Sequence, residues 1–331
     1  MGGGFGRRAV FDCHFVREAA QISKSVKAPV KVVWTREDDI RGGYYRPAAY
    51  HSISGGLDAT GNIVAWQQRI VCQSFMVGTP FEGFVVKDGV DETAVEGAKD
   101  LPYDIPNLFV DWQKAPGGVP VLWWRSVGHS HSAFAVESFL DELIHAAGKD
   151  PYEVRRALLA KHPRHRVVLE LAAGKAGWGK PLPAGRGRGL AVHESFGSFV
   201  AQVAEVSVSK EGKVRVHRVV CAIDCGPTVN PDTIRAQMES GIVFGLTAAL
   251  YGEITFENGR VKQRNFHDYP MLRMNEMPVV EAHVVPSTDK MGGVGETAVP
   301  PIAPAVANAI FAVTGKRIRR LPIRAEDLRS A

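Results

Sequence analysis

The residues with the clearest chemical potential lie in the glycine-rich segment 292–301, which has the sequence GGVGETAVPP. Three glycines within four residues allow positive φ angles and a close approach of the backbone to another group. Glu296 follows these glycines, ahead of two prolines and an apolar run that predicts a helix over 304–313. Two interpretations are open for Glu296: a carboxylate that complements the dipole of that helix, and a catalytic acid or base.

A second segment of interest is 123–132, with the sequence WWRSVGHSHS. We expect a short strand that ends at Arg125, a loop of small residues, and a helix over 133–147. Arg125 is a candidate for binding an anion or a carbonyl oxygen, and the alternative is an ion-paired surface arginine. His129 and His131 are two residues apart, but no third ligand at a suitable spacing accompanies them, which disfavours a metal site.

The N-terminal run GGGFG, residues 2–6, has the composition of loops that bind phosphate through free N–H groups. It matches neither the GxGxxG fingerprint nor a Walker loop, so a nucleotide site is weakly supported. A glycine-rich turn ordinarily joins two elements, and here no element precedes it. We therefore expect a chain that starts within a domain.

The bulk composition sets wider limits. A length of 331 residues suggests about two domains, and the flexible composition of 181–189 places their boundary between domains 1–180 and 181–331. The net charge of +5 arises from basic residues scattered among acids, without the aromatic and basic platform of a nucleic-acid binder. The densest basic cluster, 316–320, suits the end of a helix dipole. Four widely spaced cysteines favour buried thiols, and no apolar run reaches the roughly 18 residues of a membrane helix.

The predicted elements that must position these residues are of mixed type. Three pairs of strands flank polar turns that contain glycine, namely 50–57 with 62–74, 201–209 with 213–223, and 252–256 with 260–266. One more strand is expected over 31–35, and helices are expected over 9–22, 151–160, 167–173 and 232–250. The irregular stretch 81–120 is long enough to suggest a functional role. Together these elements predict an α+β fold.

Four segments, in this order, closely resemble the molybdopterin-binding large subunit of the xanthine dehydrogenase and aldehyde oxidase family. They are GGGFGRR (2–8), WRSVGHSH (124–131), the DCG and NP pairs of 224–231, and GVGE (293–296). Within the family, the sequence resembles the isoquinoline 1-oxidoreductase beta subunit and bacterial membrane-associated aldehyde dehydrogenases. The resemblance implies two α+β molybdopterin-binding subdomains of mixed sheets with helices, without the N-terminal part of the family fold.

The resemblance also implies roles for individual residues. Glu296 and Arg125 are the catalytic candidates, with Glu296 as the base and Arg125 and Phe5 shaping the substrate side. The candidate cofactor-binding residues are Gly3, Gly4, Phe5, Gly6, Arg125, Ser126, Val127, Gly128, Gln237, Gly293, Val294 and Gly295. Molybdenum would be held through the pterin, with no protein ligand.

The implied activity is hydroxylation of an N-heteroaromatic compound, or oxidation of an aldehyde, with oxygen derived from water. The implied cofactor is molybdopterin with molybdenum, and its cytosine dinucleotide form is also open. Because no iron–sulfur cysteine pattern is present, the clusters would lie on a separate small subunit. The glutamate motif continues TAVP, unlike the Glu-Pro-Pro of xanthine dehydrogenases, which disfavours purine substrates.

Two features depart from the family and keep an alternative open. The Gly-Gln-Gly cofactor loop of this branch is not found, and the family subunit is about twice as long. The alternative is a truncated or split-subunit fragment without activity of its own, which acts as a scaffold for a companion chain. The compartment stays open between a bacterial periplasm and cytoplasm.

Overall fold

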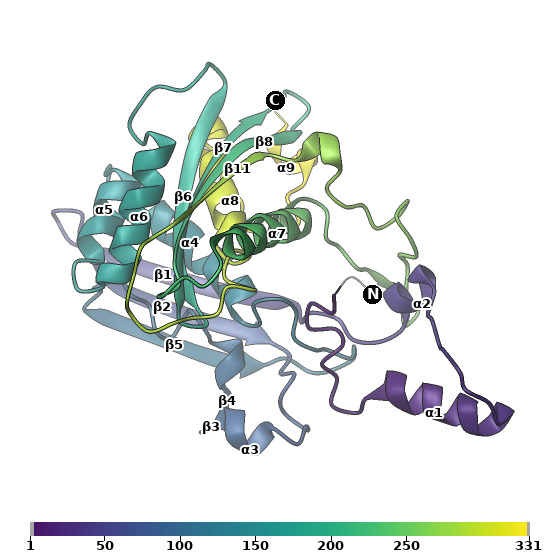
Figure 1. The fold of residues 1–331 in the computed structure, drawn as a ribbon. Coiled ribbons are helices and arrows are strands. Elements are labelled where there is room, and N and C mark those ends of the chain that lie inside the picture. Colours follow the sequence, from purple (N-terminus) through teal and green to yellow (C-terminus); the bar gives the residue numbers. More distant parts are fainter. Residues whose placement is uncertain (1–2, 330–331) are drawn as a thin grey trace.

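The computed structural model describes residues 3–329 and has an α+β fold built on two mixed sheets (Figure 1). The first sheet has the strand order β1-β2-β5, from β1 (Ala49–Leu57), β2 (Ile63–Cys72) and β5 (Asn107–Lys114). The second has the order β11-β8-β7-β6, from β6 (Arg186–Ser195), β7 (Ser198–Val208), β8 (Val214–Asp224) and β11 (Val279–Val284). In each sheet an antiparallel set gains one parallel edge strand, β5 beside β2 and β11 beside β8. The predicted fold class is confirmed.

The second sheet is covered by helices on both faces (Figure 1). Helix α6 (Pro163–Ala176) packs on β7 and β8, while α7 (Pro231–Leu250) and α8 (Ile302–Thr314) cover the opposite face. Alternation along β6 explains this arrangement, because Leu190 and Val192 join the core beneath α6 and Ala191 joins the core beneath α8. Helix α4 (His129–Ala146) contacts β1, β6 and α8, so it joins the two sheets.

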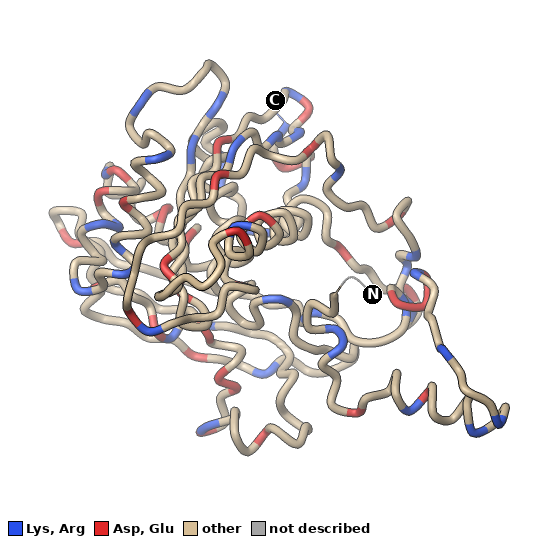
Figure 2. Tube along the Cα trace, in the orientation of Figure 1, with Lys and Arg blue, Asp and Glu red and all other residues tan. Residues whose placement is uncertain are grey.

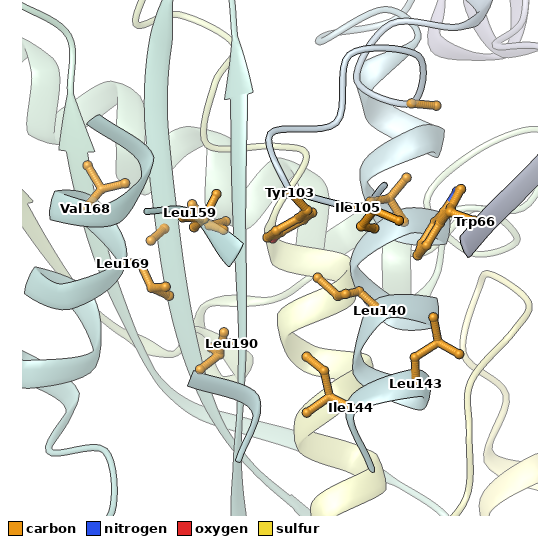
Figure 3. Close-up of a cluster of buried hydrophobic side chains, with 14 of the residues drawn as sticks. Trp66, Tyr103, Ile105, Leu140, Leu143, Ile144, Leu159, Val168, Leu169 and Leu190 are labelled. Atoms are coloured by element: carbon orange, nitrogen blue, oxygen red, sulfur yellow. The ribbon is translucent and has the colours of Figure 1, made fainter. Parts of the chain in front are cut away.

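Figure 3 shows the core that α4 organises. On one side, α4 presents Leu140, Leu143 and Ile144, and Trp66 of β2 packs in the same buried cluster. On the other side are residues of α6 and β6 and of the turn that precedes α6, namely Leu159, Val168, Leu169 and Leu190. Each such side chain contributes about 1.5–3 kcal/mol when fully buried, so α4 is held by a large apolar contact on each flank.

Helix α8 approaches the second sheet closely because β6 carries glycine where the two meet. A Cβ atom at Gly189 would lie 2.1 Å from the backbone nitrogen of Ala309 and 2.4 Å from the backbone oxygen of Ala305. This direct contact fixes the start of α8, and with it the segment 292–301 that leads into the helix.

The remaining elements are short or lie at the margin of the fold. They are α1 (His14–Val26), α2 (Arg36–Arg41), α3 (Glu82–Val85), β3 (Val86–Lys87), β4 (Val90–Asp91), the 3-10 turns η1 (Glu92–Ala94) and η2 (Met274–Glu276), α5 (Pro151–Leu158), β9 (Phe256–Glu257), β10 (Arg260–Val261) and α9 (Ala325–Leu328). Helix α1 projects from the body of the molecule (Figure 1), and none of its residues is buried. Within residues 3–329, no helix combines the length and the apolar character that crossing a membrane requires.

Several sequence predictions of local structure are wrong. Residues 31–35 form no strand, and Thr35 instead caps α2, accepting a hydrogen bond from the backbone nitrogen of Asp38. Val121 forms only an isolated bridge with Tyr45. The helix predicted from residue 133 begins at His129, and the segment 181–189, predicted to be flexible, already contains the start of β6. The hairpin predicted over 252–266 shrinks to β9 and β10.

Charged residues of both signs are interspersed over the surface (Figure 2). The basic cluster 316–320 does not complement a helix dipole, since the last turn of α8 holds no basic residue. Arg317 instead pairs with Asp141 of α4 at 2.6 Å, and Arg319 pairs with Glu142. The cluster therefore ties the segment after α8 back to α4.

The division into domains at residue 180 stays a prediction. Helix α6, which precedes that position in the chain, packs on the second sheet.

Candidate functional site

Two of the singled-out segments meet directly, although 170 residues separate them. The Nε atom of Arg125 donates a hydrogen bond to the backbone oxygen of Gly295 at 2.7 Å. Ser126 donates twice to Glu296: its hydroxyl to the backbone oxygen at 2.7 Å and its backbone nitrogen to Oε2 at 3.2 Å. These three bonds hold the Glu296 carboxylate at a fixed place beside the loop 125–128.

Arg125 is the anchor of this arrangement. It is only 4% exposed, and its Nη1 and Nη2 atoms donate to Ser240 Oγ at 3.0 Å and Gln237 Oε1 at 3.2 Å, both on α7. The interpretation of Arg125 as an ion-paired surface residue is wrong, because its side chain is buried and its hydrogen bonds go to neutral oxygens. Burial lowers the pKa of Arg125, and the nearby Glu296 carboxylate opposes that shift.

The loop between these contacts has an unusual backbone. Ser126 and Val127 have φ angles of 83° and 50°, in the left-handed region that residues other than glycine rarely adopt. A β-branched residue such as valine is especially disfavoured there, so the surrounding contacts must impose the conformation. One such contact lies at Gly128, where a Cβ atom would come 1.9 Å from the backbone oxygen of Thr93. Strain of this kind is commonly found at functional sites.

Aromatic rings stack beside Arg125. The ring of Phe244 on α7 lies between those of Phe5 and Trp124, with centroid distances of 5.0 Å and 4.7 Å. The Arg125 guanidinium lies 5.7 Å from the Phe5 ring centroid, within reach of a cation–π contact. Phe5 keeps 46% of its surface exposed, so one apolar face is open to a ligand.

The N-terminal loop reaches the site through its glycines. A Cβ atom at Gly6 would lie 2.5 Å from the backbone oxygen of Trp123, so only glycine allows this contact. Gly3 and Gly6 both have positive φ angles, and Gly4 closes a turn by accepting a hydrogen bond from the backbone nitrogen of Arg7 at 2.9 Å. The structure thus brings Phe5 and the loop 125–128 together. Gly2 lies outside the described residues.

Glu296 is half-buried, and it does not complement the dipole of α8. That helix starts at Ile302 and has no acidic residue in its first turn, so the dipole interpretation of Glu296 is wrong. Burial raises the pKa of Glu296, while the N–H group of Ser126 and the charge of Arg125 act in the opposite direction. A carboxylate with a raised pKa next to strained and glycine-rich loops has the properties of a general base.

The segment 293–296 and Gln237 also carry unused donors. Within residues 3–329, the backbone N–H groups of Val294 and Gly295 and the side-chain amide nitrogen of Gln237 have no hydrogen-bond partner. Gly293 is held by a bond from its nitrogen to the backbone oxygen of Phe196 at 2.8 Å. Molybdopterin brings a phosphate and metal-bound oxygen and sulfur atoms, which accept hydrogen bonds. Free amide donors on glycine loops therefore fit this group.

Sequence reasoning missed Ser240, Phe244 and Glu96. Ser240 and Phe244 stand three and seven residues after Gln237, so helical spacing places them on the face of α7 that Gln237 presents to the site. Glu96 gave no local signal, since it belongs to the irregular stretch 81–120. Its Oε2 atom accepts a hydrogen bond from the backbone nitrogen of Gly128 at 3.2 Å.

His129 and His131 of α4 do not act as a pair. His129 Nδ1 lies 2.9 Å from His193 Nε2, and His131 Nδ1 lies 3.0 Å from His51 Nε2. Among the described residues, no group of three or more metal-ligating side chains is assembled. The pKa of His129 is lowered to about 4 by burial, so this imidazole is neutral at physiological pH.

Comparison with known proteins connects these loops to one family. Residues 1–159 and 169–278 match two models, each described as a molybdopterin cofactor-binding domain. The chain is 33% identical over 330 residues to "Isoquinoline 1-oxidoreductase subunit beta" of Brevundimonas diminuta, covering 98% of this chain and 42% of that protein. It is 30% identical to "Membrane-bound aldehyde dehydrogenase [pyrroloquinoline-quinone]" of Gluconacetobacter polyoxogenes, covering 99% of this chain and 46% of that protein. The chain thus spans less than half the length of these relatives.

Solved structures support the same fold. Quinoline 2-oxidoreductase from Pseudomonas putida 86 superposes with a TM-score of 0.78 and 12% identity, covering 99% of this chain and 67% of that one. At this identity the similarity concerns the fold alone. Taken with the two matched domains and the relatives, it shows that the chain belongs to the molybdopterin-binding family of the xanthine dehydrogenases and aldehyde oxidoreductases.

Proposed function

We propose that this chain forms the catalytic molybdopterin-binding part of a molybdenum hydroxylase, with Glu296 as its general base. The observation that carries the proposal is the fixed position of the Glu296 carboxylate, held by Ser126 beside the buried Arg125. When bound, the molybdenum cofactor supplies the two-electron oxidation and the activation of water. The protein residues then bind, orient and accept the proton.

Glu296 is suited to accept that proton. Its Oε2 atom is engaged by the backbone nitrogen of Ser126, while Oε1 has no hydrogen-bond partner within residues 3–329. The raised pKa makes Glu296 a stronger base than an ordinary carboxylate. The proton is accepted at Oε1.

The residues around Glu296 can hold the cofactor without a protein ligand to the metal. The amide donors of 293–295 and of Gln237 suit its anionic groups, and the loop 3–6 packs closely against the backbone of Trp123. The loop 125–128 completes this set through Ser126, Val127 and Gly128. Because the sequence matches two molybdopterin-binding domains, we propose molybdopterin as the cofactor and not the pyrroloquinoline quinone that appears in the name of one relative. The cytosine dinucleotide form belongs to the same proposal.

The substrate we propose is a planar N-heteroaromatic compound or an aldehyde. The stacked rings of Phe5, Phe244 and Trp124 offer a flat apolar surface next to the charged Arg125. A planar ring can stack on the exposed face of Phe5. The name of the first relative, an isoquinoline oxidoreductase, agrees with such a substrate.

Electrons leave, in this proposal, through an iron–sulfur small subunit. Within the described residues the cysteines do not form a cluster site, since Cys13 is exposed while Cys72, Cys221 and Cys225 are buried and unpaired. Burial raises the pKa of Cys221 to about 12, so this thiol stays protonated. The first relative is itself named as a subunit, which supports a multi-subunit enzyme.

The test is the substitution Glu296→Gln in the complete enzyme that contains this chain. We expect turnover to fall by about 10²–10⁴, the usual contribution of a general base, with molybdenum content unchanged. Glu153→Gln is the control, because that carboxylate lies on α5, away from the site, with 63% of its side chain exposed. Retained turnover with full molybdenum content would refute the assignment of Glu296.

A second possibility is that the chain acts only as a scaffold for a companion chain. The exposure of Gly293 and Gly295 favours this possibility. Metal analysis of the 331-residue chain produced alone decides between the two. Stoichiometric molybdenum would exclude the need for a companion, and a metal-free folded chain would support it.

A further inference from the structure

The loop 3–6, which brings Phe5 to the candidate site, has a backbone that must be held in place by its surroundings. Gly3, Phe5 and Gly6 have φ angles of 126°, 50° and 97°, and Phe5 is a residue other than glycine in the left-handed region. Such a conformation persists only where surrounding contacts impose it. Arg7, the residue that follows the loop, makes a set of contacts that can do so.

The side chain of Arg7 lies among residues of α1 and of the segments that flank α2, which are found on one side of the molecule (Figure 1). Its Nη2 atom donates a hydrogen bond to the backbone oxygen of Gly42 at 3.0 Å and lies 3.3 Å from Nε2 of His14. The guanidinium carbon lies 5.8 Å and 5.7 Å from the ring centroids of Trp34 and Tyr44, within reach of cation–π contacts. These four residues, His14, Trp34, Gly42 and Tyr44, form what we call the arginine cage.

The fit of Arg7 in the cage is close. A Cβ atom at Gly43 would lie 2.1 Å from Nη2, so the guanidinium occupies the space that this glycine leaves free. The Nη1 atom is buried and has no hydrogen-bond partner within residues 3–329. Because Nη1 is buried and Nη2 is bound to Gly42, neither atom can reach a substrate at the site. Arg7 can therefore influence the site only through the backbone that it anchors.

The cage is itself attached to the segment that leads to the second site loop. The backbone nitrogen of Tyr45 donates to the backbone oxygen of Pro120 at 2.9 Å, and the backbone nitrogen of Leu122 donates to that of Tyr45 at 2.9 Å. Arg125 follows Leu122 by three residues. Through the cage, Arg7 thus fastens the loop 3–6 to the same backbone that carries the loop 125–128.

We propose that Arg7 is a positioning residue of the candidate site. Its guanidinium, held in the arginine cage, fixes the loop 3–6 and with it the Phe5 ring on which the substrate stacks. The stacking of a substrate on Phe5 rests on the proposed function, whereas the anchoring of the loop does not. Arg8, the next residue, has a different part, because it pairs with Asp39 at 2.8 Å on the exposed surface.

The first test measures hydrogen exchange in the complete enzyme that contains this chain. The backbone nitrogens of Arg7 and Ala9 donate to the backbone oxygens of Gly4 and Gly6 at 2.9 Å and 3.0 Å, so these two amides report whether the loop is held. We expect Arg7→Ala to accelerate exchange in the peptide 3–13 about tenfold or more, the effect of one hydrogen bond from a charged group. The peptides of α4 should exchange as in wild type.

Chemical rescue and a neighbouring control make this test specific. Guanidinium chloride at a concentration far below denaturation should refill the cage of Arg7→Ala and restore protection. Ammonium chloride should not, because only the planar guanidinium can face the two rings and donate to the Gly42 oxygen together. Arg8→Ala removes the same charge but only an exposed ion pair, so exchange in the peptide 3–13 should stay close to wild type. Unchanged exchange in Arg7→Ala, or equal acceleration in Arg8→Ala, would overturn the inference.

The second test separates positioning from a general loss of stability. With isoquinoline as the probe, Arg7→Ala should raise KM about three- to tenfold, the contribution of one aromatic stack, while kcat per bound molybdenum changes less. Guanidinium chloride should lower KM again in this variant but not in wild type. A lowered kcat with unchanged KM would overturn the positioning role. A wild-type enzyme that does not oxidise isoquinoline would count only against the proposed function, since the exchange measurement decides on Arg7 without substrate.

Discussion

At the scale of single residues, the site depends on a conformation that its own sequence disfavours. Ser126 and Val127 hold positive φ angles only because the contacts of Arg125 and Gly128 on either side of them over-determine the loop. Both carboxylates are bound through backbone nitrogens of this loop, Glu296 by Ser126 and Glu96 by Gly128. A small shift of the loop would therefore move both groups together.

The pKa of Glu96 predicts how stability depends on pH. Its folded value of about 8 lies above the ordinary value of 4.5, so between them the folded state binds more protons than the unfolded state. The stability from Glu96 is thus fully present below about pH 4.5 and is lost as the pH rises through about 8. We expect Glu96→Gln to melt close to wild type at pH 5 and above it at pH 9. Parallel melting curves across this range, measured by calorimetry, would contradict the prediction.

At the scale of elements, a buried ionic group ties α4 to α5. Arg155 is fully buried, and its Nε atom donates to Glu137 Oε2 at 3.0 Å. Glu137 also accepts hydrogen bonds from the Tyr103 hydroxyl and from the backbone nitrogen of Val192, which belongs to β6. This ionic group therefore links four parts of the molecule: the segment before β5, the helices α4 and α5, and the strand β6 of the second sheet.

Arg155→Leu should therefore destabilise the chain by about 3–5 kcal/mol, because it leaves the carboxylate of Glu137 buried and unpaired. The control is Arg156→Leu on the same helix, whose pair with Glu170 is partly exposed and contributes at most about 1 kcal/mol. Urea unfolding of the two variants measures the difference. Equal midpoints would mean that the buried pair contributes no more than the surface pair.

A second prediction concerns the contact between β6 and α8. Gly189→Ala would place a methyl group within 2.1 Å of the α8 backbone, so we expect a loss of about 3 kcal/mol or more, beyond the usual cost of overpacking. Gly174→Ala is the control in α6, where a Cβ atom meets nothing within 4 Å, and it should stabilise by about 0.5–1 kcal/mol. Thermal midpoints that move in the same direction would contradict this account.

At the scale of the whole molecule, the sequence predicted what local chemistry determines. The turn sequences at 58–61 and 210–212 predict the hairpins β1–β2 and β7–β8, and both hairpins are confirmed. The parallel strands β5 and β11 were missed because their partners are distant in the chain. β6 was missed because its glycines, including Gly189, resemble a linker when their contact with α8 is unknown.

The residues of the candidate site also divide into those that the sequence singles out and those that only distant contacts bring to the site. Glu296, Arg125 and Phe5 stand in motifs that the family shares, so the resemblance singled them out. Glu96 and Phe244 join the site only through contacts between elements that are far apart in the sequence. Physical reasoning from sequence alone had no local signal for Glu96, because its unusual environment is created by Gly128, His129 and Glu296.

The projecting helix α1 gives a prediction for the whole chain. A helix of 13 residues is marginal in water unless its apolar face is packed, and none of the residues of α1 is buried. Phe15, Val16 and Val26 all remain exposed. In the 331-residue chain alone, we therefore expect the amides of α1 to exchange with deuterium close to the unfolded rate, while those of α4 exchange only with global unfolding. Mass spectrometry of peptides from both helices measures this contrast, and equal protection would show that α1 gains its stability from contacts other than burial.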